Sequence, residues 1–408
     1  MSEPHKDIVI IGTLDTKGVE ISFLASQLQS LNLTTKIIDV GIGSTPQIQA
    51  DIGRDVVASK TASDIARILI HTEGKLKAMD AMARGAIGVL EELIESDEVS
   101  GVMALGGGVG TWIGMKILRS LPFGLPKIMI STLPFDIRSS MGAKDIMIIP
   151  SVTDILGLNP ILRKVLQNAA GAMVGMAQLS ELSATSAQVV AVTALGVTTP
   201  LANSCKYILE AEGYEVATFH GVGVGGKIFE EWVQTGLFTG VLDLTPHDIN
   251  NFLFDGITPF YSGRLESAAD KNIPQVIAPG GLDFISKGPL DTLSQEERQR
   301  KHYQHSPMFT HVRVNSAEME EVARELAIKL NRGSGTTQVA IPLRGFSFQG
   351  HAKGYLADHQ SDMSFVRVLK QKLQPVIPVV EVDAHINDES FAKVVCTLLL
   401  QMINSNQT

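Results

Sequence analysis

A glycine-rich stretch, GGGVGT at residues 106–111, constrains the fold of this chain more than any other feature. It follows an apolar run at 99–105, which predicts a buried strand, and precedes an amphipathic pattern at 112–118, which predicts a helix. A strand, a glycine turn and a helix together present free backbone N–H groups to an anion. The stretch therefore predicts either a phosphate-binding loop or a tight turn with no ligand, since short glycine patterns also occur without one.

The same strand–turn–helix unit recurs along the chain. Apolar runs typical of parallel strands alternate with helical patterns, and a polar segment at 183–187 separates two such series. We therefore expect an α/β protein with two Rossmann-like domains, at residues 1–184 and 185–408, with mostly parallel sheets related by internal duplication. The expected strands are 7–11, 34–40, 99–105, 127–132 and 145–150 in the first half, and 188–194, 214–219, 239–245, 274–279, 308–314, 337–342 and 376–382 in the second.

The composition fits a globular protein of more than one domain. The chain has 408 residues and a net charge of −9, which argues against a non-specific surface for nucleic acid or anionic membrane. Its two cysteines, Cys205 and Cys396, predict buried, unreactive thiols and not a disulfide framework or a metal site. The polar beginning is no signal peptide, and no apolar run approaches the ~20 residues that span a bilayer. We expect a cytoplasmic protein with no membrane or nucleic-acid partner.

Polar residues gather where the strands of the first half end. Ligands of doubly wound sheets bind at the carboxyl ends of strands, so these residues predict a nucleotide site. Lys17 would neutralise a phosphate, Asp15 would hold Mg²⁺, and Asp39 would hold a ribose hydroxyl. The alternatives are a solvated Lys17, a helix cap at Asp15, and a helix or turn cap at Asp39. The predicted cofactor-binding residues are Thr13, Asp15, Thr16, Lys17, Asp39, Gly106, Gly107, Gly108, Gly110, Thr111, Ser131 and Thr132.

A second glycine turn, GVGVGGK at 221–227, precedes a helical pattern at 228–236. It predicts an anion site at a helix N-terminus, with a structural turn as the alternative. It does not predict NAD, because a dinucleotide fold places this turn after its first strand. His220 is a candidate acid or base, and Arg264 with Lys227 and Arg344 is a candidate clamp for a carboxylate or phosphate. The predicted anion-site residues are Gly221, Gly223, Gly225, Gly226 and Lys227.

A polar loop at 351–362 is a third candidate site. His351, Asp358, His359 and Asp362 could bind a divalent metal, although their spacing matches no known zinc pattern. The alternative is that Asp358 or Ser361 caps the helix that follows.

Six segments occur in an order that resembles a known family: GTLDTKG at 12–18, GGGVGT at 106–111, DILGLN at 154–159, GVTTP at 196–200, FHGVGVGG at 219–226 and GRLESAA at 263–269. Together they resemble the tobamovirus-resistance-protein-like ATP-binding domain family over nearly the whole chain. The resemblance implies two Rossmann-like domains, ATP binding and self-association as a homo-oligomer, a dimer or a tetramer. It implies no established reaction.

The chain departs from the pattern of that family at two places near the expected nucleotide. The family's glycine loop is closer to GGSGGT, and here Gly108 and Val109 replace its third and fourth residues. The next strand usually ends in STxASGD, whereas LPFD follows Ser131 and Thr132 in this chain. If that turn contacts the nucleotide, affinity or ligand choice differs here.

These features predict an ATP-binding enzyme that couples ATP, with Mg²⁺, to a small anionic metabolite in a cleft between the two domains. Two other classes stay open: an ATP-binding regulatory or interaction protein that catalyses nothing, and a metal-dependent hydrolase that uses the loop at 351–362.

Overall fold

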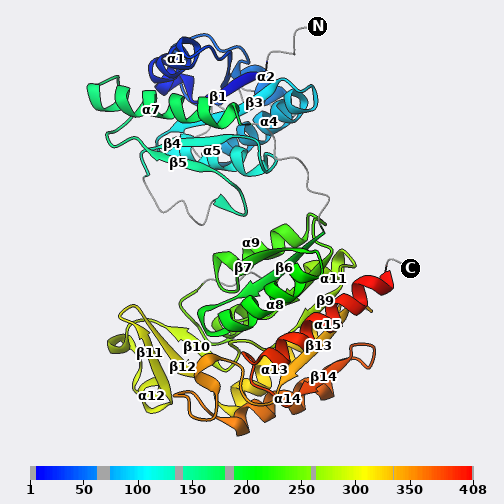
Figure 1. Ribbon diagram of the computed structural model, residues 1–408. Helices are drawn as coiled ribbons and strands as arrows, with labels where there is room; N and C mark the ends of the chain where they lie inside the picture. Colours follow the sequence, from blue (N-terminus) through cyan, green and yellow to red (C-terminus); the bar gives the residue numbers. More distant parts are fainter. Residues whose placement is uncertain are drawn as a thin grey trace. The chain divides into compact units, whose positions relative to one another are not determined.

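The computed structural model describes residues 6–61, 74–133, 141–179, 188–258, 263–333 and 335–406 (Figure 1). Contacts divide the chain into two compact units, Met1–Ala184 and Thr185–Thr408, which we call the N-terminal and C-terminal units. Each unit contains an α/β sheet whose strands are parallel, so the predicted fold class is confirmed. No helix within the described ranges is long and apolar enough to cross a membrane.

The N-terminal unit is a five-stranded parallel sheet covered by helices on both faces. Its strand order is β2-β1-β3-β4-β5. Along β1, Ile8 and Ile10 pack against α1 and α7, whereas Val9 and Ile11 pack against α2, α4 and α5, because successive side chains of a strand point to opposite faces. The elements are β1 (Asp7–Gly12), α1 (Leu14–Ser30), β2 (Thr35–Asp39), α2 (Arg54–Ser59), α4 (Lys75–Glu95), β3 (Val99–Gly106), α5 (Gly108–Ser120), β4 (Lys127–Ser131), β5 (Met147–Pro150) and α7 (Pro160–Ala177).

The C-terminal unit has a six-stranded parallel sheet and a smaller antiparallel one. The large sheet has the order β7-β6-β8-β9-β13-β14, with α8 and α15 packed on one face and α9, α13 and α14 on the other. The strands are β6 (Val189–Ala194), β7 (Glu215–His220), β8 (Gly240–Asp243), β9 (Gln275–Ile277), β13 (Thr337–Pro342) and β14 (Val379–Val382). The helices are η2 (Gly196–Thr198), α8 (Thr199–Ala211), α9 (Val224–Val233), α10 (Asp248–Leu253), α11 (Ser267–Asp270), η3 (Leu290–Thr292), α12 (Gln295–Gln299), α13 (Ser316–Leu330), η4 (Phe348–Gly350), α14 (His359–Lys372) and α15 (Glu389–Asn406).

Both large sheets follow the same order along the chain: the second strand lies at the edge, the first beside it, and the third on the other side of the first. One predicted correspondence is wrong. The run at 308–314 forms β12 (Phe309–Arg313) of the antiparallel sheet, between β10 (Phe284–Lys287) and β11 (His302–Ser306), and β13 takes the fifth parallel place. Ser306 pairs with Phe309 across a tight hairpin, so the local antiparallel partner replaces a distant parallel one.

Candidate functional site

The carboxyl edge of the N-terminal sheet contains a topological switch point between β1 and β3. After β1 the chain enters α1 on one face of the sheet, and after β3 it enters α5 on the other face. The two connections therefore diverge at the strand ends, which is the place where open α/β sheets bind ligands. The stretches at 12–17 and 106–111 lie on the two sides of this point.

The start of α5 is open to solvent and lacks a side-chain cap. Gly107 is the N-cap residue, and no side-chain hydrogen bond caps the helix, whose first N–H groups have no partner within the helix. A Cβ at Gly106 would lie 2.5 Å from the Cα of Gly110, so this glycine is needed for close packing of the turn. At Gly107 and Gly108 a Cβ would meet nothing within 4 Å. These two glycines leave an open approach to the N–H groups of the helix.

Two of the predicted phosphate donors point inward. Thr111 and Ser131 are fully buried, and their hydroxyl oxygens lie 2.7 Å apart. The Thr111 hydroxyl donates to the carbonyl of Gly106 at 3.1 Å, and the Ser131 hydroxyl accepts the Leu133 N–H at 2.9 Å. The two hydroxyls join β3, α5 and β4 in this structure, so both are engaged in internal hydrogen bonds. Thr132 is half-buried at the end of β4.

Asp39 caps α1 from the neighbouring strand. Its Oδ1 accepts the N–H of Leu14 at 3.1 Å and the N–H of Gly41 at 2.8 Å, and the side chain is buried. Burial raises the pKa of this carboxyl. The alternative role as a cap therefore describes Asp39, which has no exposed oxygen to offer a ribose.

The start of α1 carries polar groups on the other side of the switch point. The hydroxyls of Thr13 and Thr16 lie 2.9 Å apart. Asp15 is half-buried beside the loop after β2, where a Cβ at Gly43 would collide with Oδ2 of Asp15. Among the residues that the structure describes, no three acidic, histidine or cysteine side chains are grouped for a metal ion, so Mg²⁺ at Asp15 stays a prediction.

Lys17 is tied to the loop that follows β5. Its Nζ donates to the carbonyl of Ile155, and Glu20, one turn further along α1, accepts the N–H of Gly157 at 2.7 Å. Two contacts thus fasten this loop to the start of α1. The ammonium group lies at the predicted edge of the sheet but is partnered by backbone oxygen.

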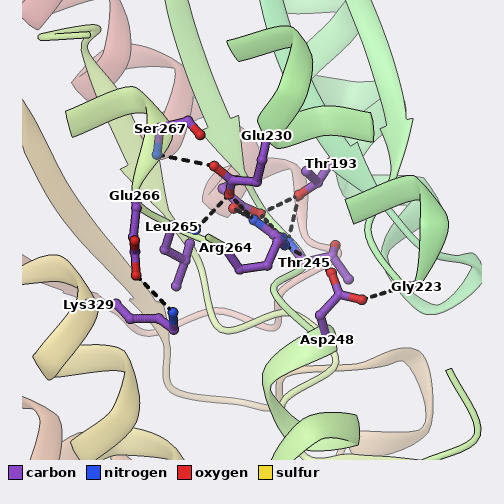
Figure 2. A network of polar contacts seen from close by, with 11 residues as sticks. Thr193, Gly223, Glu230, Thr245, Asp248, Arg264, Leu265, Glu266, Ser267 and Lys329 are labelled. Atoms are coloured by element: carbon purple, nitrogen blue, oxygen red, sulfur yellow. Dashed lines mark hydrogen bonds and ion pairs between the residues drawn. The ribbon is translucent and has the colours of Figure 1, made fainter. Parts of the chain in front are cut away.

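The second glycine turn already holds an anion, which is the protein's own Asp248 (Figure 2). Gly223 has a positive φ of 60° and donates its N–H to Oδ1 of Asp248. Oδ2 of Asp248 accepts from Nε of Arg264 at 2.9 Å, and a Cβ at Gly226 would collide with this oxygen. In this structure an internal contact with Asp248 therefore occupies the predicted anion site at 221–227.

Arg264 is the centre of a buried ion cluster and not a clamp that faces solvent. Its Nη1 lies 2.5 Å from Asp243 and 2.9 Å from Glu230, and all these side chains are 0–2% exposed. Glu230 also accepts the N–H groups of Leu265 at 2.6 Å and Ser267 at 3.1 Å. Burial raises the pKa of Glu230, and it raises that of Asp248 to about 6 although Arg264 opposes the shift.

The other predicted residues of the C-terminal unit are not brought together at one site. His220 is exposed at the end of β7, and Lys227 pairs with Glu231 inside α9 at 3.9 Å. Arg344 pairs with Asp383 through two contacts of 2.7 Å. The expected combination of Arg264, Lys227 and Arg344 is therefore not assembled.

The loop before α14 caps the helix that follows it. Asp358 accepts the N–H of Ser361 at 3.1 Å, as the alternative predicted. Asp362 is buried against Arg313, and burial raises its pKa to about 7. His351 and His359 complete no ligand group with them in the described part of the chain.

The equivalent switch point of the C-terminal unit, between β6 and β8, is filled by side chains. The hydroxyls of Thr198 and Thr245 lie 2.7 Å apart across it, and both residues are fully buried. The switch point of the N-terminal unit differs in lying beside Gly107 and Gly108, where a Cβ would meet nothing within 4 Å.

A buried His–Ser pair was missed because its members lie 39 residues apart and share no motif. His247 Nδ1 lies 2.6 Å from the Gly281 carbonyl, and Nε2 lies 2.8 Å from the Ser286 hydroxyl. The Phe284 ring lies against the imidazole at a centroid distance of 4.3 Å, with the two ring planes tilted by 35°. Burial lowers the pKa of His247 to about 4, so the ring is a neutral, hydrogen-bonded core group.

Comparison with known proteins identifies the family. The N-terminal domain model of the uncharacterised protein family UPF0261 matches residues 6–182, and the C-terminal domain model of the same family matches residues 187–403. The chain belongs to the UPF0261 family. A UPF0261 protein of Clostridium tetani is 36% identical over 98% of this chain and 99% of its own length. A UPF0261 protein of Rhizobium meliloti is 32% identical over 95% of this chain and 97% of its own length.

The predicted resemblance to the tobamovirus-resistance family is confirmed. The ToMV resistance protein Tm-1 of Solanum lycopersicum is 32% identical to this UPF0261 chain over 97% of the chain. The match covers 55% of the tomato protein, so the chain spans about half of its length.

Proposed function

We propose that the N-terminal unit binds the phosphate groups of ATP at the β1/β3 switch point. The observation that carries this proposal is the uncapped start of α5 beside Gly107 and Gly108, where a Cβ would meet nothing within 4 Å. Phosphate oxygens accept hydrogen bonds from such N–H groups, and the helix dipole favours their negative charge.

The groups at the start of α1 complement this site. The hydroxyl pair of Thr13 and Thr16 supplies hydrogen bonds, and Lys17 supplies a positive charge after leaving the Ile155 carbonyl. Asp15, half-buried at the same edge, would hold Mg²⁺ through water between its carboxylate and the phosphates. If Mg²⁺ binds together with the nucleotide, Lys17 is the one protein cation that the proposal needs to neutralise the phosphate charge.

We further propose that the chain is an enzyme that couples ATP to a small anionic metabolite and that it acts as a homo-oligomer. The turn at 221–227 does not serve as the metabolite site in this proposal, because Asp248 fills it. A non-catalytic ATP-binding protein is the second candidate. ADP release measured with a panel of metabolites separates the two, since a binding protein releases none above background.

The test is calorimetric titration with ATP, with and without Mg²⁺, on wild type and on Gly108→Val. The valine side chain enters open space in the free protein and occupies the approach to the α5 N–H groups. We expect ATP affinity to fall at least tenfold, about 1.4 kcal/mol. Gly171→Ala is the matched control, because this glycine lies in α7 and its Cβ also meets nothing within 4 Å.

Each outcome decides something. Affinity that Gly108→Val lowers and Gly171→Ala leaves unchanged supports the site. Equal ATP binding by all three proteins places the nucleotide elsewhere, and absence of binding to the wild type overturns the nucleotide proposal.

A further inference from the structure

The two cysteines of the sequence meet in the core of the C-terminal unit. Cys205 lies in α8 and Cys396 in α15, 191 residues apart, and both are fully buried. The Sγ of Cys396 lies 3.9 Å from the carbonyl oxygen of Cys205. A hydrogen bond with the Cys396 thiol, together with burial, raises the pKa of the Cys205 thiol well above its usual range. The predicted burial of both thiols is confirmed, and their proximity to each other is new.

The contact is fixed by the packing of two helices that lie side by side (Figure 1). On α8, Leu201 and Leu209 lie one turn before and after Cys205, and all three are buried in one cluster. On α15, Ala392 precedes Cys396 by one turn in the same cluster. Each cysteine thus occupies the middle of the stripe with which its helix packs, so the two residues meet across the helix interface.

We propose that Cys205 and Cys396 are a covalent modification site at which a peroxide oxidises the two thiols to an intramolecular disulfide. One thiol ionises, and its thiolate attacks an oxygen of hydrogen peroxide, which breaks the O–O bond and gives a sulfenic acid and hydroxide. The hydroxide takes up the proton that the thiol released and becomes water. The second thiol attacks that sulfur, forms the S–S bond and releases the sulfenic oxygen as a second water. Two thiols are oxidised, and one peroxide is reduced to two waters.

The environment selects the oxidant and sets the pace of this reaction. Neither thiol is accessible from the surface, so the oxidant must be small and uncharged to enter the apolar core. The thiolate is the nucleophile, and the raised pKa of Cys205 keeps its fraction low at neutral pH. We therefore expect slow oxidation that accelerates as the pH rises.

The bond would tie the last helix of the chain to the first long helix of the C-terminal unit. A covalent link between residues 191 apart closes a long loop and so restricts the unfolded chain. In the native state it would prevent α15 from separating from α8. The oxidised form should therefore melt later and resist proteolysis at its C-terminal end.

The experiment treats the full chain with hydrogen peroxide at neutral and alkaline pH, then alkylates it under denaturing conditions. The expected result is a monomer without alkylated thiols, a mass lower by two hydrogens, and a tryptic peptide that links Cys205 to Cys396. Its Tm should rise by about 5 °C and return to the starting value with dithiothreitol.

Cys205→Ala and Cys396→Ala are the matched controls, because alanine is small enough for either helix and each variant retains one thiol. Both should gain sulfinic acid or remain thiols, with no rise in Tm, and circular dichroism checks that they fold. Two alkylated thiols after treatment of the wild type, over-oxidation without the linked peptide, or cross-linking only between chains would each overturn the proposal.

Discussion

Asp248 accepts the backbone N–H of Gly223 although the two residues lie 25 positions apart. The same carboxylate binds Arg264, so it joins the glycine turn before α9 to the buried ion cluster. The contact places a fixed negative charge where a phosphate would bind in a nucleotide loop. The turn at 221–227 has the sequence pattern of an anion-binding loop, but its N–H group contacts a carboxylate of the protein itself.

We expect Asp248→Ala to lower the free energy of unfolding by about 3 kcal/mol. The change leaves the Gly223 N–H without its partner and Arg264 with two carboxylates in place of three. Urea titration measures the loss. Sodium formate should restore part of the stability of the variant and have no such effect on Asp291→Ala, an exposed acid of the same unit. If formate affects both variants equally, the carboxylate does not act as a bound anion.

Lys17→Ala should weaken ATP binding about tenfold, or about 1.4 kcal/mol, if the nucleotide occupies the proposed site. The ammonium group belongs to the first turn of α1 and donates to the Ile155 carbonyl in the present structure. Calorimetry measures the affinity, and Lys164→Ala, at an exposed lysine of α7, controls for the loss of a charge. An unchanged affinity in Lys17→Ala would remove Lys17 from the site.

Substitution by alanine should have opposite effects on stability at two glycines of the turn between β3 and α5. Gly106→Ala places a Cβ 2.5 Å from the Gly110 Cα, so we expect a loss of about 2 kcal/mol or more in unfolding free energy. Gly108→Ala enters open space at a helical position and should raise stability by about 0.5 kcal/mol. Chemical denaturation of the three proteins side by side tests the order. Equal stability of the two variants would contradict the packing described for the turn.

Acid should destabilise the C-terminal unit through its buried histidines. Burial lowers the pKa of His247 to about 4 and that of His311 to about 3, from 6.5. The unfolded chain then binds more protons than the native one below pH 6.5, so their contribution to stability falls as the pH drops toward 4. Asp362 and Asp248, with pKa values raised to about 7 and about 6, act in the opposite direction: their contribution falls as the pH rises.

The difference between wild type and His247→Gln isolates one histidine from these opposing groups. Glutamine does not titrate and offers an oxygen near the position of Nε2, which accepts from Ser286. Between pH 6.5 and pH 5 the wild type should lose about 2 kcal/mol more unfolding free energy than the variant. Parallel pH profiles of the two proteins would show that His247 does not keep its lowered pKa.

The features of the fold that depend on a local sequence pattern, such as strands and glycine turns, were predicted from the sequence. The apolar run of β1 and the glycine turn before α5 were sufficient to place the strand ends at one edge, because parallel strands bury both faces. The prediction for β12 was wrong, since an apolar run does not reveal whether its partner is a neighbouring hairpin strand or a distant parallel one. The tertiary partner of each run decides the sheet to which it belongs.

The side-chain roles were harder to predict because their partners come from distant segments. In the sequence, Arg264 suggests a free cation. In the fold, α9, β8 and α10 place Glu230, Asp243 and Asp248 around it. The sequence allows Asp39 either to bind a ribose or to cap a helix or turn. The hydrogen bonds that it accepts from Leu14 and Gly41 show the cap. No spacing in the sequence carries this information.

The fastening of the loop after β5 has a consequence for exchange kinetics. Lys17 and Glu20 each make one hydrogen bond from α1 to this loop, at Ile155 and Gly157. A ligand that draws Lys17 toward a phosphate removes one contact and leaves the other. The amides around Gly157 would then exchange their hydrogens with solvent faster when the proposed site is occupied than when it is empty, so hydrogen exchange in this loop would report on binding at the start of α1.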